Sequence, residues 1–137
     1  IVRISSNELV KKQEKWQRVA IEACKQSGQN WLPKVHIPKK PEELIQSDQL
    51  KYDLLLIASL QKESNHFKKI LSEYQISHQN IKPRSVLILI GPEGDFTPSE
   101  LNVDLNFGCA PMTLGPIVLR SETAALYSLS VLSYELS

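Results

Sequence analysis

The sequence predicts one α/β domain with a mostly parallel sheet, and two apolar runs with the turns that follow them carry this prediction. Residues 52–60 (YDLLLIASL) and 86–90 (VLILI) have the composition of strands that are buried on both faces of a parallel sheet. The second run ends in the glycine turn 91–94 (GPEG), and a helix signal follows, because Thr97 and Glu100 form a capping box. Strand, glycine turn and helix in this order mark the edge where open α/β sheets bind their ligands.

A second glycine turn lies in residues 113–120 (TLGPIVLR), directly before the last helix. Ala58 and Ser59, at the end of the first buried run, suggest a further ligand edge. Neither glycine turn has the spacing of a dinucleotide-binding or P-loop cradle, and no histidine lies near either turn to complete a Ser/His/Asp triad. The turns are therefore either tight structural turns or backbone loops that present N–H and C=O groups to a flat polar ligand.

The other elements follow from caps, breakers and apolar spacing. Ser5 and Glu8 form a capping box for a long helix that Gly28 ends. Residues 33–37 are a strand candidate, although Pro33 weakens it. In chain order we expect a helix at 6–27, strands near 33–37, 53–58, 86–90 and 111–114, short helices at 42–47, around 67–74 and at 98–105, and a last helix at 121–136.

Composition excludes several classes of protein. The chain has 137 residues, 42% of them hydrophobic and 23% charged, which is typical of a soluble domain with a real core. No apolar run approaches the roughly 20 residues that a membrane span needs. The start of the chain has no signal-peptide pattern, and because it begins with Ile1 we expect that its native N-terminus is missing. Cys24 and Cys109 are expected to be reduced core thiols of an intracellular protein, and neither they nor the histidines have metal-ligand spacing.

Positive charge is concentrated at the start of the chain. Residues 1–40 contain nine Lys and Arg against three Glu, a net charge of +6, whereas residues 41–137 carry −5. Lys11, Lys15 and Arg18 lie on one face of the first helix and are candidate contacts to RNA phosphates. The alternative is a solvated helix face. Trp16 falls on the apolar stripe of the same helix and is expected to anchor a core rather than to stack on a base.

The last helix has apolar residues around much of its circumference. Because a helix turns by about 100° per residue, five side chains of this helix cannot all face one sheet. We therefore expect a homodimer in which some of them meet a second copy. The side chains in question are Leu126, Tyr127, Leu129, Ser130 and Tyr134.

Three blocks resemble the RsmE family of SPOUT-class (α/β-knot) RNA methyltransferases. They are IGPEGDFTPSEL from Ile90, LGPIVLRSETAALYSL from Leu114 and WQRVAIEACKQSGQNWLPKV from Trp16. They occur in the order found in the family, and the resemblance extends from about Ser5 to Leu136. It implies a SPOUT-type parallel sheet with helices on both faces and a C-terminal deep trefoil knot, within one methyltransferase domain at residues 1–137.

The resemblance also implies an activity, which is methyl transfer from S-adenosylmethionine to N3 of a uridine in small-subunit (16S-type) ribosomal RNA. It implies an obligate homodimer, no metal and no membrane, in the bacterial cytoplasm or in a plastid or mitochondrion. The loop 58–60 matches the family less well and is left out of the site. By matching position, the cofactor contacts are Ile90, Gly91, Glu93, Gly94, Leu114, Gly115, Ile117, Val118 and Leu119.

The chemistry requires a group that handles a proton, because N3 of uridine is protonated at neutral pH and is a poor nucleophile. Glu122 is a candidate base, and Arg120 is a candidate for stabilising the uridine anion or a phosphate. Alternatively, Glu122 only stabilises the start of the last helix through the helix dipole.

Three positions depart from the family pattern. Gln29 and Ile117 replace basic residues, and Asp95 stands where a second glycine is usual. Family members also carry an N-terminal PUA-like RNA-binding barrel, which these residues do not include. Two alternative functions therefore remain, a non-catalytic RNA-binding relative and a SPOUT methyltransferase for another RNA.

Overall fold

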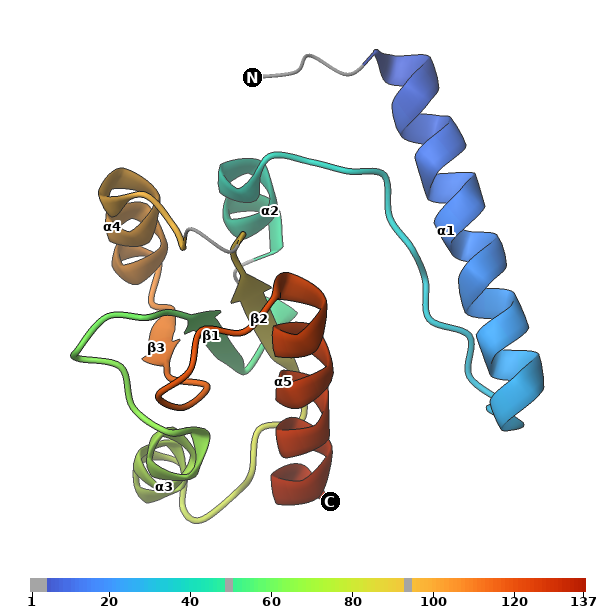
Figure 1. Ribbon diagram of the computed structural model, residues 1–137. Helices are drawn as coiled ribbons and strands as arrows, with labels where there is room; N and C mark the ends of the chain where they lie inside the picture. The colour runs from blue at the N-terminus through green and yellow to red at the C-terminus, as the bar shows by residue number, and fades with distance from the viewer. Residues whose placement is uncertain (1–4, 49–50, 93–94) are drawn as a thin grey trace. The chain divides into compact units, whose positions relative to one another are not determined.

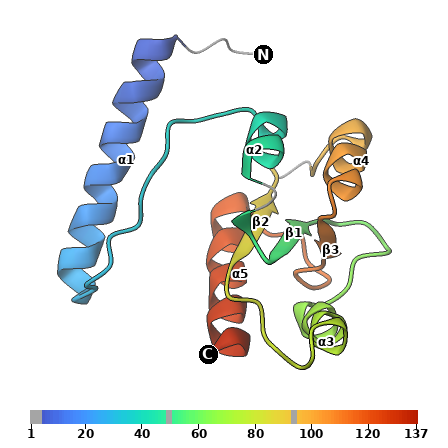
Figure 2. The same cartoon turned by 180° about the vertical axis from the view of Figure 1, so that it is seen from behind.

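The computed structural model describes residues 5–48, 51–92 and 95–137. Residues 1–40 and 41–137 form two units, each of which is described by itself. Figures 1 and 2 show the chain from opposite sides. The prediction of one domain for the whole chain stays a prediction.

The second unit is built on a three-stranded parallel sheet, as predicted. Strands β1 (Leu54–Ala58), β2 (Val86–Ile90) and β3 (Ala110–Met112) lie in the order β2-β1-β3. Leu54 is opposite Val86, and Leu56 is opposite Ala110. The last strand ends at Met112 rather than at the predicted residue 114, because the Thr113 N–H donates to the Asn65 carbonyl instead of to a strand.

Helices cover both faces of this sheet, as the sequence predicts (Figures 1 and 2). Alternate residues of β1 point to opposite faces. Ile57 packs in a cluster with Leu101 of α4 (Pro98–Asn106), and Leu44 of α2 (Pro41–Asp48) lies against that cluster. Leu56 packs on the other face in a cluster with Phe67 of α3 (Phe67–Ser77). Three side chains of α5 (Ser121–Leu136) pack against this second cluster, namely Val131, Leu132 and Leu136. The main apolar core is thus divided by the sheet.

Helix α4 begins with the predicted capping box. The Glu100 N–H donates to Thr97 Oγ1 at 3.3 Å, and the Thr97 N–H donates to the Glu100 carboxylate at 2.8 Å. The backbone N–H and then the hydroxyl of Thr97 hold the pKa of Glu100 below its ordinary value. This cap fixes where the chain leaves the turn after β2 and starts the helix.

The same helix buries an acidic side chain. Asp104 is 3% exposed, and its Oδ2 has no hydrogen-bond partner among the described residues. Burial, followed by the negative charges of Glu100 and Glu42, raises the pKa of Asp104. Burial, followed by Asp104, raises the pKa of the Cys109 thiol to about 11. Cys109 is therefore an inert core thiol, as expected.

The first unit has a different construction. Its helix α1 (Ser6–Ser27) starts and ends as predicted, with the Ser5–Glu8 capping box and Gly28 at its end, yet it buries no side chain. Trp16 is 46% exposed, so the prediction that it anchors a core is wrong for this unit. Cys24 is half-buried rather than in a core, and both cysteines are free.

The predicted strand at 33–37 is not a strand. Pro33 has no N–H to donate, and two helix side chains take the place of a partner strand. The Gln17 amide accepts from the Val35 N–H at 2.8 Å and donates to the Pro33 carbonyl at 3.0 Å. The Gln13 amide donates to the Val35 carbonyl at 2.9 Å. The backbone is thereby held extended along α1 without sheet pairing.

Within the parts of the chain that the structure describes, no helix has both the length and the apolar character that a membrane span requires.

Candidate functional site

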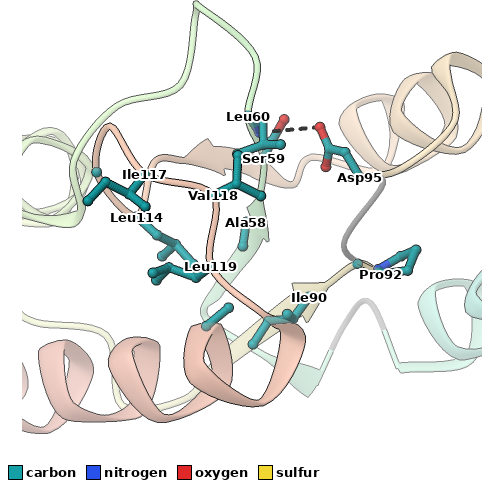
Figure 3. Close-up of a pocket in the computed structure, with 13 residues that line it drawn as sticks. Ala58, Ser59, Leu60, Ile90, Pro92, Asp95, Leu114, Ile117, Val118 and Leu119 are labelled. Carbon is teal, nitrogen blue, oxygen red and sulfur yellow. Dashed lines mark hydrogen bonds between the residues drawn. The ribbon is translucent and has the colours of Figure 1, made fainter.

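A pocket opens where the three parallel strands end. Figure 3 shows its walls. They come from the end of β1 and the loop after it (residues 58–60), from the end of β2 and the turn after it (residues 90–92 and Asp95), from the loop after β3 (residues 114, 115 and 117–119) and from Ala124 of α5. Carboxyl ends of parallel strands share one edge of a sheet, so the three loops meet there. The chain passes from β1 to β2 on one side and then to β3 on the other, and such a reversal of strand order is where α/β sheets bind ligands.

The turn after β2 is packed tightly from two sides. The Ser121 hydroxyl of α5 donates to the Gly91 carbonyl at 3.0 Å, which joins this turn to the start of the last helix. A Cβ added at Gly91 would lie 2.9 Å from Cε2 of Phe96. Phe96 in turn packs against the core cluster that contains Ile57 and Leu101. Because Gly91 has no Cβ, the backbone of the pocket wall can contact the ring of Phe96, which packs on the core.

Asp95 closes the same turn and connects two walls of the pocket. Its φ is +66°, a conformation that glycine adopts freely and that Asp tolerates better than most residues. Its N–H donates to the Pro92 carbonyl at 2.9 Å. Its Oδ2 accepts from the Leu60 N–H at 3.3 Å, as the dashed line in Figure 3 marks. The carboxylate thus ties the loop after β1 to the loop after β2.

The loop after β3 is shaped by Thr113 and Gly115. The Gly115 N–H donates to Thr113 Oγ1 at 3.2 Å, and Gly115 has a φ of +105°, which favours glycine. The chain then presents apolar side chains at the surface, with Ile117 71% exposed and Val118 59% exposed. This wall of the pocket is apolar and open on its outer side.

The structure gathers seven of the nine predicted cofactor contacts in this pocket, and Glu93 and Gly94 lie outside the described residues. The role of all nine stays a prediction. Six further residues line the pocket without a predicted role in cofactor binding, although Ala58 and Ser59 suggest a ligand edge because they end a buried run. In the sequence, Asp95 stands out only because it occupies the position of a family glycine. The six are Ala58, Ser59, Leu60, Pro92, Asp95 and Ala124.

The two candidate catalytic residues lie beside the pocket but do not line it. Arg120 and Glu122 are exposed at the start of α5, between the lining residues Leu119 and Ala124. Glu122 is in the first helical turn, where an acidic side chain stabilises a helix. The geometry is therefore compatible with both predicted roles of Glu122.

The candidate RNA contacts belong to the other unit. Lys11, Lys15 and Arg18 are all exposed on α1, and their spacing puts them on one face of that helix. In the described parts of the chain, no group of three or more His, Cys, Asp and Glu side chains is placed to hold a metal ion.

The lining has a defined chemical character. Its side chains are mainly aliphatic, which suits the faces of a flat ring, and three loops contribute to its walls. Asp95 adds a carboxylate, which suits a ligand with positive charge. The pocket therefore fits a small molecule that combines a heteroaromatic ring with a cationic group.

Comparison with known proteins gives consistent results. A family model described as RNA methyltransferase domain matches residues 1–133. Ribosomal RNA small subunit methyltransferase E of Bacillus subtilis is 34% identical over 139 residues, which cover 98% of this chain and 52% of that protein. The chain spans about half the length of this relative and of the relative of the same name from Mesomycoplasma hyopneumoniae.

Solved structures are also similar to this chain. A Legionella pneumophila protein solved with bound cofactor SAM has a TM-score of 0.83 and 33% identity, covering 98% of this chain and 50% of that one. Ribosomal RNA small subunit methyltransferase E of Neisseria gonorrhoeae, solved with S-adenosyl methionine, has a TM-score of 0.77 and 25% identity, with 98% and 52% coverage.

Proposed function

Because the chain belongs to the RNA methyltransferase domain family, as the RsmE resemblance predicted, we propose that it transfers a methyl group from S-adenosylmethionine to N3 of a uridine in small-subunit ribosomal RNA. The observation that carries this proposal is the pocket at the carboxyl ends of β1, β2 and β3, with its apolar walls and single described carboxylate. The names of the relatives support a ribosomal RNA substrate, and two similar structures contain the same cofactor.

The pocket residues fit this cofactor. Ile90, Leu114 and Leu119 would contact the adenine and ribose, and the backbone of the loops after β2 and β3 would bind their polar edges. When bound, S-adenosylmethionine supplies a methyl group on a positively charged sulfur, already activated for transfer. The contribution of the chain is to hold the acceptor in line with that methyl group and to keep water away from it.

The chain must also handle the proton on uridine N3. In the proposal a carboxylate oxygen of Glu122 accepts this proton, and the Arg120 guanidinium stabilises the negative charge that develops on the base. Both side chains are exposed at the start of α5, where a macromolecular substrate can reach them. If Glu122 only stabilises the helix start, its amide variant keeps the activity.

RNA binding and dimer formation belong to the same proposal. Lys11, Lys15 and Arg18 would contact phosphates. A second copy would cover the apolar side chains that α5 exposes, among which Leu126 is 68%, Leu129 61% and Tyr134 81% exposed. Sedimentation at micromolar concentration tests the dimer, and a monomer in the presence of S-adenosylmethionine would contradict it.

We also propose that the C-terminal segment forms a deep trefoil knot, which is a rare exception to unknotted topology. The contact between Ser121 and Gly91 supports this, because it holds the segment after β3 close to the turn after β2. An experimental structure in which the chain after Leu114 passes through no loop of earlier residues would refute the knot.

A non-catalytic RNA-binding relative is the second candidate. Gln29 and Ile117, which stand where the family has basic residues, are both exposed, so the positive charge that they replace would have faced solvent or RNA. A methyltransferase for another RNA is a variant of the first proposal.

Two assays distinguish these functions. Calorimetry should show binding of S-adenosylmethionine, and no binding by a well-folded chain would contradict any methyltransferase. Labelled methyl transfer to small-subunit ribosomal RNA, with the modified base mapped, should place the label on uridine N3.

A variant tests the role of Glu122. Glu122→Gln should lower the rate of methyl transfer at least a hundredfold if Glu122 is the base. A pH profile equal to that of the unmodified chain would assign Glu122 a structural role.

A further inference from the structure

Asp95 is the one charged side chain among the described residues that line the pocket. Its surroundings there are mainly apolar, including Ile90, Leu114 and Val118. The side chain is half-buried, so its charge is only partly screened by water. A ligand in this pocket therefore experiences a fixed negative charge with little opposing charge from the described part of the lining.

One hydrogen bond orients the carboxylate, and a second fixes the backbone that carries it. The Leu60 N–H binds Oδ2 at 3.3 Å, and the N–H of Asp95 itself binds the Pro92 carbonyl at 2.9 Å. In Figure 3 the side chain reaches from the turn after β2 toward the loop after β1. The ion pairs of the described residues join Lys25 to Glu22 and Lys69 to Glu73, and neither of them involves this carboxylate.

The position also shows what an aspartate adds. With a φ of +66°, the backbone favours glycine, so the conformation alone does not require a carboxylate. An aspartate keeps this turn and introduces one negative charge together with the contact to Leu60. The charge is therefore an addition to the turn, and its effect can be separated from the turn by substitution.

We propose that Asp95 is a specificity-determining residue that makes the pocket prefer a ligand with net positive charge. The inference rests on the proposed function and deepens it. S-adenosylmethionine carries a sulfonium, an ammonium and a carboxylate, a net charge of +1 at neutral pH. Its demethylated product, S-adenosylhomocysteine, has a neutral thioether and a net charge of zero. Asp95 thus favours the methyl donor and helps the spent product to leave.

The expected size of this preference is modest. Two unit charges about 4 Å apart interact, even at the dielectric constant of water, by an amount equal to roughly a fivefold change in binding. Removing the charge of Asp95 should therefore lower the affinity for S-adenosylmethionine about fivefold and leave the affinity for S-adenosylhomocysteine within about twofold.

The test compares Asp95→Asn with a matched control. Asparagine tolerates the same backbone conformation, and its amide oxygen can still accept from the Leu60 N–H. Glu63→Gln removes the same charge from an exposed residue three positions after Leu60 that does not line the pocket. Calorimetry gives the ratio of the affinities for the two ligands in the unmodified chain and in each variant. Thermal unfolding checks that each variant is folded.

The proposal predicts that this ratio falls about fivefold in Asp95→Asn and stays unchanged in Glu63→Gln. Equal weakening of both ligands would mean that Asp95 only shapes the pocket, and would overturn the inference while leaving the proposed function in place. If the unmodified chain binds neither ligand, the proposed function itself fails.

A second measurement uses the unmodified chain and does not depend on the folding of a variant. Because salt screens the interaction between charges, the ratio of the two affinities should fall as sodium chloride is raised from 50 mM to 500 mM. A ratio that does not change with salt would also overturn the inference.

Discussion

The two units of this chain are stabilised in different ways. In residues 41–137, the sheet buries Leu56 and Ile57 completely, and helices cover both of its faces. In residues 1–40, the long helix α1 buries no side chain, and the segment after it is held by the amides of Gln13 and Gln17. The second unit is therefore organised by apolar burial, and the first by caps and polar contacts.

This difference corresponds to the two functions that we propose, cofactor binding by the second unit and RNA binding by the first. A pocket that holds a small molecule needs walls fixed by a core, and this pocket lies where the strands of the sheet end. A surface that contacts RNA phosphates needs exposed cations, and α1 presents Lys11, Lys15 and Arg18 without a core beneath them.

The largest effect is expected from a cavity in the sheet. Leu56→Ala removes a side chain that is 0% exposed and should lower the free energy of unfolding by about 2–5 kcal/mol. The matched change Val19→Ala on α1, at a residue that is 62% exposed, should alter it by less than about 0.5 kcal/mol. Denaturant unfolding measures both values. Equal losses would mean that α1 contributes to the core as much as β1 does.

A smaller loss is expected at the pocket wall. In Gly91→Ala the new Cβ meets the ring of Phe96, which packs on the core, so the turn or the ring must move. We expect a loss of about 1–3 kcal/mol in the free energy of unfolding and weaker binding of S-adenosylmethionine. Ser72→Ala, at an exposed residue of α3 that does not line the pocket, is the control. Full stability and full binding in Gly91→Ala would show that the wall is not constrained by the core.

The buried Asp104 should make the stability of the second unit depend on pH. Its pKa is raised in the folded chain, so the folded state holds the proton more tightly than the unfolded state does. This stabilisation is complete below the ordinary carboxyl pKa and is lost as pH rises through the raised value. Asp104→Asn should remove this decrease and be more stable than the unmodified chain at pH 7. Unfolding midpoints across pH 3–8 test this, and parallel curves for the two chains would contradict it.

The smallest effect on stability is expected on the exposed face of α1. Replacing Lys11, Lys15 and Arg18 together by Gln should leave the unfolding midpoint nearly unchanged. The affinity for RNA should depend less steeply on salt. The slope of the logarithm of the RNA association constant against the logarithm of the salt concentration should become less negative by up to about 2. The control replaces three exposed lysines of the second unit, Lys62, Lys68 and Lys69. The same reduction in the control would mean that only total charge matters.

Features set by neighbouring residues could be predicted from the sequence. The capping boxes at Ser5 and Thr97 connect residues three positions apart, and the last helix has the predicted limits. The two apolar strands and the residues after them are likewise visible in short stretches, and they form most of the pocket wall. Strand β1 is buried as predicted, whereas β2 lies at an edge of the described sheet and buries only Leu89, so the prediction that it is buried on both faces is wrong.

Features that depend on distant partners could not be predicted. Residues 33–37 have the composition of a strand, but the partners of that segment are two glutamines about 20 positions earlier. Leu60 and Asp95 are 35 positions apart, so their contact follows only from the fold. Trp16 lies on an apolar stripe, yet a stripe does not show whether another surface covers it.

Amide hydrogen exchange with and without saturating S-adenosylmethionine tests the central claim, that the pocket at the strand ends of the second unit is the cofactor site. We predict slower exchange of the backbone amides of residues 58–60, 90, 91, 114, 115 and 117–119. Pro92 and Pro116 have no N–H and give no signal. Exchange within α1 should change much less. Binding with unchanged exchange in all three loops, or with protection concentrated elsewhere, would contradict this account.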